Sequence, residues 1–184
     1  IGIDRLSLLD IQGSEDVVDL EPDAGAPGYY AGFSSSAGAG TGYRYELDKE
    51  LLRYPDPASR YQPDGPHGAS QVIDSDAFEW TDREWRGISR EGQIIYEMHV
   101  GTFSKEGTWQ GAQRELVELA AIGITVIEVM PVADFPGRFG WGYDGVGLFA
   151  PTWLYGEPND FRAFVNAAHT QGIGVILDVV YNHL

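Results

Sequence analysis

The sequence predicts an α/β fold in its second half and mainly β structure in its first. From residue 93 onward, apolar segments of strand length alternate with segments of helical spacing, which is typical of a parallel sheet with crossover helices. The same helix-to-strand joint also occurs twice, as Gly-Ile-Thr-Val-Ile at 123–127 and Gly-Ile-Gly-Val-Ile at 172–176. Tandem βα units require such a repeated joint, so we expect a parallel α/β array.

Residues 1–52 are predicted to form β-hairpins. Apolar and polar residues alternate around Leu6 and Leu8 and again around Tyr43 and Tyr45, which is the period of a strand with one buried face. A complete seven-stranded sandwich needs about 100 residues. We therefore expect this region to be part of a β-sandwich rather than a whole one.

Residues 53–92 are predicted to be an irregular linker that packs against a neighbouring surface. Proline fixes φ and removes a backbone donor, so a proline-rich segment resists regular structure. Aromatic side chains among acidic residues are expected to hold the segment in place. The prolines are Pro55, Pro57, Pro63 and Pro66, and the aromatic residues are Phe78, Trp80 and Trp85.

Three strands are predicted in the second half, at residues 94–100, 125–129 and 173–180. The last is apolar on both faces, as in a parallel sheet covered on both sides. A complete (β/α)8 barrel takes about 250 residues, so we expect residues 93–184 to form the first three strands and two helices of such a barrel. Three strands alone would leave an apolar edge exposed, which favours a part of a longer protein.

Two helices are predicted between these strands. The first has apolar residues at helical spacing from Trp109 to Ala120, and Gly123 provides its C-terminal stop. The second begins with Pro158 at its first position and is closed by Gly172. A long loop at 131–157 separates the middle strand from the second helix, and loops of this length are often functional.

The composition excludes several classes of function. The 184 residues include 28 acidic and 12 basic ones, for a net charge of -16, and so acidic a surface repels nucleic acids and anionic membranes. No apolar run approaches the roughly 20 residues of a membrane-spanning helix. The chain has no cysteine, and its four histidines lack metal-binding spacing. We expect no metal and no cofactor, and neutral sugars remain open as ligands.

Polar residues follow the last predicted strand. Asp178, Asn182 and His183 come where its apolar run ends, and the carboxyl ends of parallel strands are where sites form. Their donors and acceptors suit the hydroxyl groups of a polar ligand. The alternative is that Asp178 is a hydrogen-bonded residue at a strand end and Asn182 forms a turn.

Two further places could contact a ligand. Trp141 and Tyr143 lie among glycines in the long loop, where aromatic faces could stack on sugars or could merely cover the end of the sheet. Glu97 and His99 share one face at the end of the first strand. A structural hydrogen bond is as plausible there as a substrate contact, and the same holds for Glu128 in the second strand.

The chain resembles glycoside hydrolase family 13, the α-amylase superfamily. Asp178-Val-Val-Tyr-Asn-His183 is similar to the first signature region of that family, at the end of barrel strand three. Tyr96-Glu-Met-His-Val-Gly-Thr-Phe103, Glu128-Val-Met-Pro-Val-Ala133 and Trp141-Gly-Tyr-Asp144 resemble the members that release trehalose from maltooligosyltrehalose. Branching and debranching enzymes that act on glycogen share parts of this pattern.

The resemblance implies an immunoglobulin-like, carbohydrate-binding sandwich before the barrel, a maltooligosaccharide-type substrate and a cytoplasmic location. It implies that Tyr143 stacks on the sugar next to the scissile bond and that His183 hydrogen-bonds to it. Trp141 and Asp144 complete the substrate-binding set that we expect. The residues that support this wall of the site are Asp178, Asn182 and His99.

The resemblance also places the catalytic residues after Leu184. A retaining glycosidase needs two carboxyl groups about 5 Å apart across the bond. In the family these are an Asp after strand four and a Glu after strand five, with a second Asp after strand seven. We therefore expect the parent protein to be an enzyme and residues 1–184 alone to be inactive. The alternatives are a branching or debranching enzyme and a non-catalytic module that binds glucans.

Overall fold

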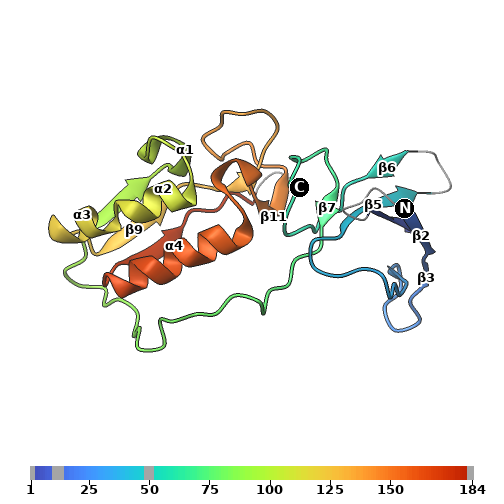
Figure 1. The fold of residues 1–184 in the computed structure, drawn as a ribbon, viewed down its shortest axis with the longest axis horizontal. Coiled ribbons are helices and arrows are strands. Elements are labelled where there is room, and N and C mark those ends of the chain that lie inside the picture. Colours follow the sequence, from blue (N-terminus) through green and yellow to red (C-terminus); the bar gives the residue numbers. More distant parts are fainter. Residues whose placement is uncertain (1–2, 10–14, 48–51, 182–184) are drawn as a thin grey trace.

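The computed structural model describes residues 3–9, 15–47 and 52–181. It has an antiparallel β region towards the N-terminus and an α/β region after residue 93, as the sequence predicts (Figure 1). The connection between them runs along helix α4 (Pro158–Thr170). None of the helices in the described part of the chain has the length and apolar character that crossing a bilayer requires.

The N-terminal region contains the strands β1 (Ile3–Leu9), β2 (Glu15–Asp19), β3 (Glu21–Pro22), β4 (Tyr30–Ala31), β5 (Gly42–Leu47), β6 (Arg53–Tyr54) and β7 (Ser70–Gln71). Antiparallel pairing gives the order β2-β1-β5-β6, with β7 also paired to β5, and β3 pairs with β4 in a separate sheet. The sheet therefore continues past residue 52, because β6 and β7 come from the segment predicted as linker.

Tyr43 fixes the proline-rich part of that segment onto the sheet. Its Oη donates a hydrogen bond to Asp56 Oδ2 at 2.6 Å, and the backbone N–H of Asp56 donates to Ser70 Oγ at 2.9 Å. Burial, and then the hydrogen bond to Asp56, raise the pKa of Tyr43 above its ordinary value, so the phenol remains a donor. The proline-rich stretch is held by side chains rather than by regular structure.

The second half of the linker is held against α4. The backbone N–H of Thr81 donates to Asn166 Oδ1 at 2.9 Å, and Asn166 Nδ2 donates back to Thr81 Oγ1 at 2.8 Å. Asp82 Oδ2 lies 2.6 Å from His169 Nδ1, and the ring of Trp85 stacks on His169 at 4.4 Å. Trp85 thus packs against α4 through the His169 ring.

The α/β region has a three-stranded parallel sheet. Its strands are β8 (Ile95–Met98), β9 (Val126–Val129) and β12 (Gly174–Leu177), in the order β12-β9-β8. The strands lie where the sequence predicts them, but all three are shorter. The first ends before Val100 because the N–H groups of Thr102 and Phe103 turn back to the His99 carbonyl and start helix α1 (Val100–Phe103).

The predicted long loop contains regular structure of its own. Strands β10 (Ala133–Asp134) and β11 (Gly147–Pro151) pair antiparallel, and a single 3-10 turn, η1 (Trp153–Tyr155), follows. The Thr152 N–H donates to the Val132 carbonyl at 2.8 Å and closes the base of this excursion. The loop is therefore a folded lobe that reaches back to the end of β9.

Helices form at both predicted places. The first is divided into α2 (Trp109–Arg114) and α3 (Leu116–Ala121), because the Glu115 N–H turns to the Ala112 carbonyl. The second is α4, whose N-terminus carries a capping box between Glu157 and Asp160.

Both repeated joints have the same geometry. Gly123 and Gly172 adopt φ of 93° and 75°, and the following N–H groups of Ile124 and Ile173 each bond to the carbonyl five residues earlier. A side chain at either glycine would strain this backbone, so the glycines account for the repeat in the sequence.

The core lies between the sheet and its helices, which cover one face in Figure 1. Trp109 is fully buried and stacks on Phe161 at 4.2 Å, with Phe164 and Tyr155 against its other sides. The edge strands are less covered, since Ile95 is 55% exposed and Ile176 is 39% exposed. Ile176 is the register partner of Glu128, so its exposure lies on the face of the sheet opposite the helices.

Candidate functional site

The predicted site residues within the described range gather where the parallel strands end. His99 follows β8, and Asp178 follows β12 with its N–H bonded to the Val129 carbonyl of β9 at 2.9 Å. Tyr143, from the lobe between β10 and β11, donates from its Oη to Asp178 Oδ2 at 3.2 Å. The structure thus brings together two residues that were predicted separately. Asn182 and His183 lie outside the described residues.

Tyr143 lies in a negatively charged setting. The pKa of Tyr143 is raised, and the largest cause is partial loss of hydration. The hydrogen bond to Asp178 and the negative charges of Asp178, Glu97 and Glu128 raise it further. Glu97 and Glu128 are register partners in β8 and β9, so both side chains project from the face of the sheet opposite the helices. The Tyr143 hydroxyl is therefore a protonated donor beside a polar, acidic strand edge.

A glycine fixes how the aromatic loop approaches the sheet. Gly142 has φ of 90°, and its α-carbon lies so close to Pro131 that a Cβ would be 2.6 Å from the Pro131 carbonyl carbon and would overlap the oxygen. Only glycine permits both this φ and this approach. Trp141 and Tyr143, on either side of it, are held at the end of β9 as a consequence.

His99 ties three segments together. Its Nε2 lies 2.9 Å from the Gly140 carbonyl and 3.1 Å from Tyr155 Oη, and its Nδ1 lies 3.0 Å from Thr102 Oγ1. Because a carbonyl can only accept, the contact with Gly140 places a proton on Nε2. His99 therefore contacts the loop that carries Trp141 through the Gly140 carbonyl.

Two cavities flank Trp141. One, of about 510 Å³, is lined by residues that include Tyr96, Glu97 and Met130. The other, of about 530 Å³, includes Glu106 and Arg138. His99, Thr102 and Trp141 line both, and Trp141 is 73% exposed. An exposed aromatic face between two hollows that each contain some polar groups can stack on one sugar ring while neighbouring groups hydrogen-bond on each side.

Asp134 is a buried carboxylate that the sequence analysis missed. It is fully buried in β10, and among the described residues neither carboxylate oxygen has a hydrogen-bond partner by geometry. Burial raises its pKa to about 6, although the Thr152 hydroxyl, the Phe135 amide and His67 lie near enough to lower it partly. An acidic residue inside an otherwise apolar Pro-Val-Ala-Asp-Phe segment was the available signal.

Comparison with known proteins assigns the family. The catalytic domain of α-amylase matches residues 31–184. The chain belongs to the α-amylase family. Within the described ranges, no three or more His, Cys, Asp or Glu side chains lie together in a way that could hold a metal ion.

Proteins similar to this chain occur in several organisms. The malto-oligosyltrehalose trehalohydrolase of Saccharolobus solfataricus is 50% identical over 157 residues, which are 85% of this chain and 28% of the relative. That of Deinococcus radiodurans is 49% identical over 144 residues, or 78% and 24%. The 1,4-alpha-glucan branching enzyme of Pseudoalteromonas atlantica is 34% identical over 174 residues, or 85% and 24%. The chain spans about a quarter of the length of these α-amylase family relatives.

Solved structures support a barrel of the glycoside hydrolase type. A putative α-amylase from Salmonella typhimurium has a TM-score of 0.85 and 42% identity, and the match covers 98% of this chain and 30% of that one. A pullulanase from Anoxybacillus sp. LM18-11, complexed with maltotetraose, has a TM-score of 0.72 at 22% identity, over 98% and 32%. The α/β region is thus the kind of barrel segment that the sequence predicts for this family.

The stability of this α-amylase family chain should depend on pH through Asp134. The folded state holds its proton more tightly than the unfolded chain does, because the pKa rises from 3.8 to about 6. The ionisation of Asp134 therefore does not lower the free energy of unfolding at low pH. Above pH 6 it should lower the free energy of unfolding by up to about 3 kcal/mol. Asp134→Asn, which cannot ionise, should unfold at higher urea than the original chain at pH 7.5 and at the same urea near pH 4.

Asp144→Asn is the matched control, since Asp144 is an exposed carboxylate of the same lobe. Urea unfolding followed by circular dichroism measures both variants. A stabilisation by Asp134→Asn that is equal at both pH values would contradict the titration of Asp134.

Proposed function

We propose that the chain is part of a glycoside hydrolase that acts on α-1,4-linked glucans and releases trehalose from maltooligosyltrehalose. The observation that carries this is the Tyr143 to Asp178 hydrogen bond at the strand ends, with the exposed Trp141 ring beside it. Relatives 40% to 50% identical carry the trehalohydrolase name, which supports the choice within the family.

In this proposal each residue has a binding or positioning role. Tyr143 presents its ring to the sugar beside the scissile bond, and Asp178 fixes the ring through the phenol hydrogen. His99 holds the Gly140 carbonyl, and thereby the loop that presents Trp141. Asp144, Asn182 and His183 complete the proposed wall.

Residues 1–184 are proposed to bind the glucan without cleaving it. Retaining hydrolysis requires a nucleophile and a proton donor about 5 Å apart, and the resemblance places that pair after residue 184. The β region is proposed to be part of a carbohydrate-binding sandwich. The cytoplasmic location stays a prediction.

The proposal is tested by the products of the longer protein that carries this chain. With maltooligosyltrehalose as substrate, trehalose should appear together with the shortened maltooligosaccharide. If no trehalose appears, the formation or loss of α-1,6 branches in glycogen would favour the branching and debranching alternative, which the 34% identical branching enzyme supports. The absence of both sets of products would contradict the proposed hydrolase.

Tyr143 should dominate binding at this site. Tyr143→Ala removes the ring, so we expect maltoheptaose to bind at least tenfold more weakly, a loss of about 1.4 kcal/mol or more. Tyr143→Phe keeps the ring and removes the hydroxyl that bonds to Asp178, which should weaken binding by roughly twofold to tenfold. Isothermal titration calorimetry measures both.

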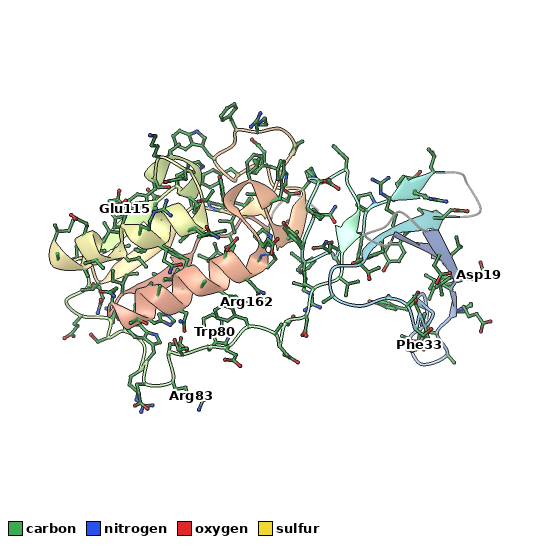
Figure 2. The ribbon with its side chains drawn as sticks, in the orientation of Figure 1. Asp19, Phe33, Trp80, Arg83, Glu115 and Arg162 are labelled. Carbon is green, nitrogen blue, oxygen red and sulfur yellow. The ribbon has the colours of Figure 1, made fainter. Side chains whose placement is uncertain are left out.

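Phe33→Ala is the control for that experiment. Phe33 is 87% exposed and lies in the N-terminal β region, far from the strand ends (Figure 2). It should bind maltoheptaose like the original chain. Loss of binding in Phe33→Ala but not in Tyr143→Ala would place glucan binding on the β region and contradict the role of Tyr143.

A further inference from the structure

A second groove lies between α4 and the linker. It consists of two cavities, of about 330 Å³ and about 320 Å³, that share Ile73, Pro158 and Arg162 as lining residues. Arg162 thus stands between two hollows of one groove. Figure 2 places Trp80 of the linker next to Arg162 of α4, and both line the first cavity.

The first cavity presents aromatic surface. Trp80 is 42% exposed and Phe149 is 63% exposed, and Phe161 lines the same hollow. The Trp80 ring is held by an edge contact with Phe78 at 4.9 Å. Its backbone is anchored one residue later by the Thr81 to Asn166 pair. Trp80 therefore offers a preset ring face that loses little side-chain freedom when a ligand binds.

The second cavity presents polar groups. Gln71, Asp74 and Glu157 line it together with Asn159 and Arg162, so amide, carboxylate and guanidinium groups face one hollow. The Arg162 guanidinium donates to Asn159 Oδ1 at 2.6 Å, and this bond orients it within the groove. Such a mixture of donors and acceptors suits a neutral ligand with many hydroxyl groups. Asp74 and Glu157, in a chain of net charge -16, disfavour an anion.

We propose that this groove binds a second segment of α-1,4-glucan, with a sugar stacked on Trp80 and the next one hydrogen-bonded around Arg162. The choice of an α-1,4-glucan as ligand rests on the proposed function, whereas the position of the binding site in this groove does not. Aromatic faces take the CH-rich sides of sugars, and the polar cavity takes their hydroxyls. The groove would hold a long glucan chain outside the strand-end site.

Maltotriose titration in the Tyr143→Ala background tests this groove with the strand-end site weakened. Tyr143→Ala should still bind maltotriose. Adding Trp80→Ala should weaken that binding roughly tenfold, and adding Trp80→Phe, which keeps a ring, should weaken it less than threefold. Arg162→Gln in the same background should also weaken maltotriose binding. If circular dichroism shows that Trp80→Ala does not fold, the Arg162→Gln variant tests the groove in its place.

Three results would overturn the proposal that this groove binds glucan. They are no maltotriose binding by Tyr143→Ala, unchanged maltotriose binding after Trp80→Ala and Arg162→Gln are added, and binding of inorganic phosphate in place of maltotriose. Each of these leaves the proposed function standing, because trehalose release is measured separately. Absence of trehalose with maltotriose still bound through Trp80 would instead remove the hydrolase and keep the groove.

Discussion

Gly142→Ala should detach the aromatic loop from the sheet and abolish glucan binding at the strand ends. The new Cβ would overlap the Pro131 carbonyl oxygen, which is backbone and cannot rotate away, and φ at this position is 90°. Strain at positive φ costs roughly 1–2 kcal/mol and forced overpacking adds typically 1–3 kcal/mol, so we expect a total loss of about 2–5 kcal/mol. Urea unfolding and maltoheptaose calorimetry measure the two effects.

Gly137→Ala separates the overlap from the strain. Gly137 lies in the same lobe with φ of 97°, but a Cβ there would meet nothing within 4 Å. It should therefore cost only the roughly 1–2 kcal/mol of backbone strain and leave glucan binding intact. Equal effects of the two substitutions would show that contact with Pro131 does not position Tyr143.

Trp109→Ala should bring the chain close to unfolding. The ring is fully buried between α2, α4 and η1, in contact with Phe161, Phe164 and Tyr155. Removing a buried aromatic side chain costs about 3–5 kcal/mol, a large share of the 5–15 kcal/mol by which domains are stable. Thermal unfolding followed by circular dichroism should show a much lower midpoint.

Trp109→Phe is the matched substitution. It keeps a ring against Phe161, and the Trp109 Nε1 that it removes has no hydrogen-bond partner among the described residues. Its cost should therefore stay below about 2 kcal/mol, from the smaller ring alone. A loss as large as that of Trp109→Ala would mean that Nε1 makes a bond which stabilises the fold.

Local pattern predicted the parallel sheet and its helices well, because strands and helices of this kind carry their own periodicity. Gly123 and Gly172 marked both helix ends, since a left-handed φ requires glycine. The strands β6, β7, β10 and β11 were not predicted. Most are only two residues long and form through pairing with distant partners, so no period in the sequence reveals them.

The site divides in the same way. Tyr143 and Asp178 could be named from the sequence, because an aromatic loop and a polar strand end each suggest a ligand. Their mutual hydrogen bond spans 35 residues and needs the folded lobe. Asp134 was missed because its burial comes from the tertiary fold. The groove at Arg162 was missed because it needs the linker and α4 side by side.

The contacts that hold the linker on α4 also have a consequence during synthesis on the ribosome. Thr81 is bonded to a residue 85 positions later, and Asp82 to one 87 positions later. At about 5–20 residues per second, roughly 4–17 seconds pass before those partners are made. Throughout that interval Trp80 and Trp85 lack the helix that covers them, and they are free for a chaperone to bind.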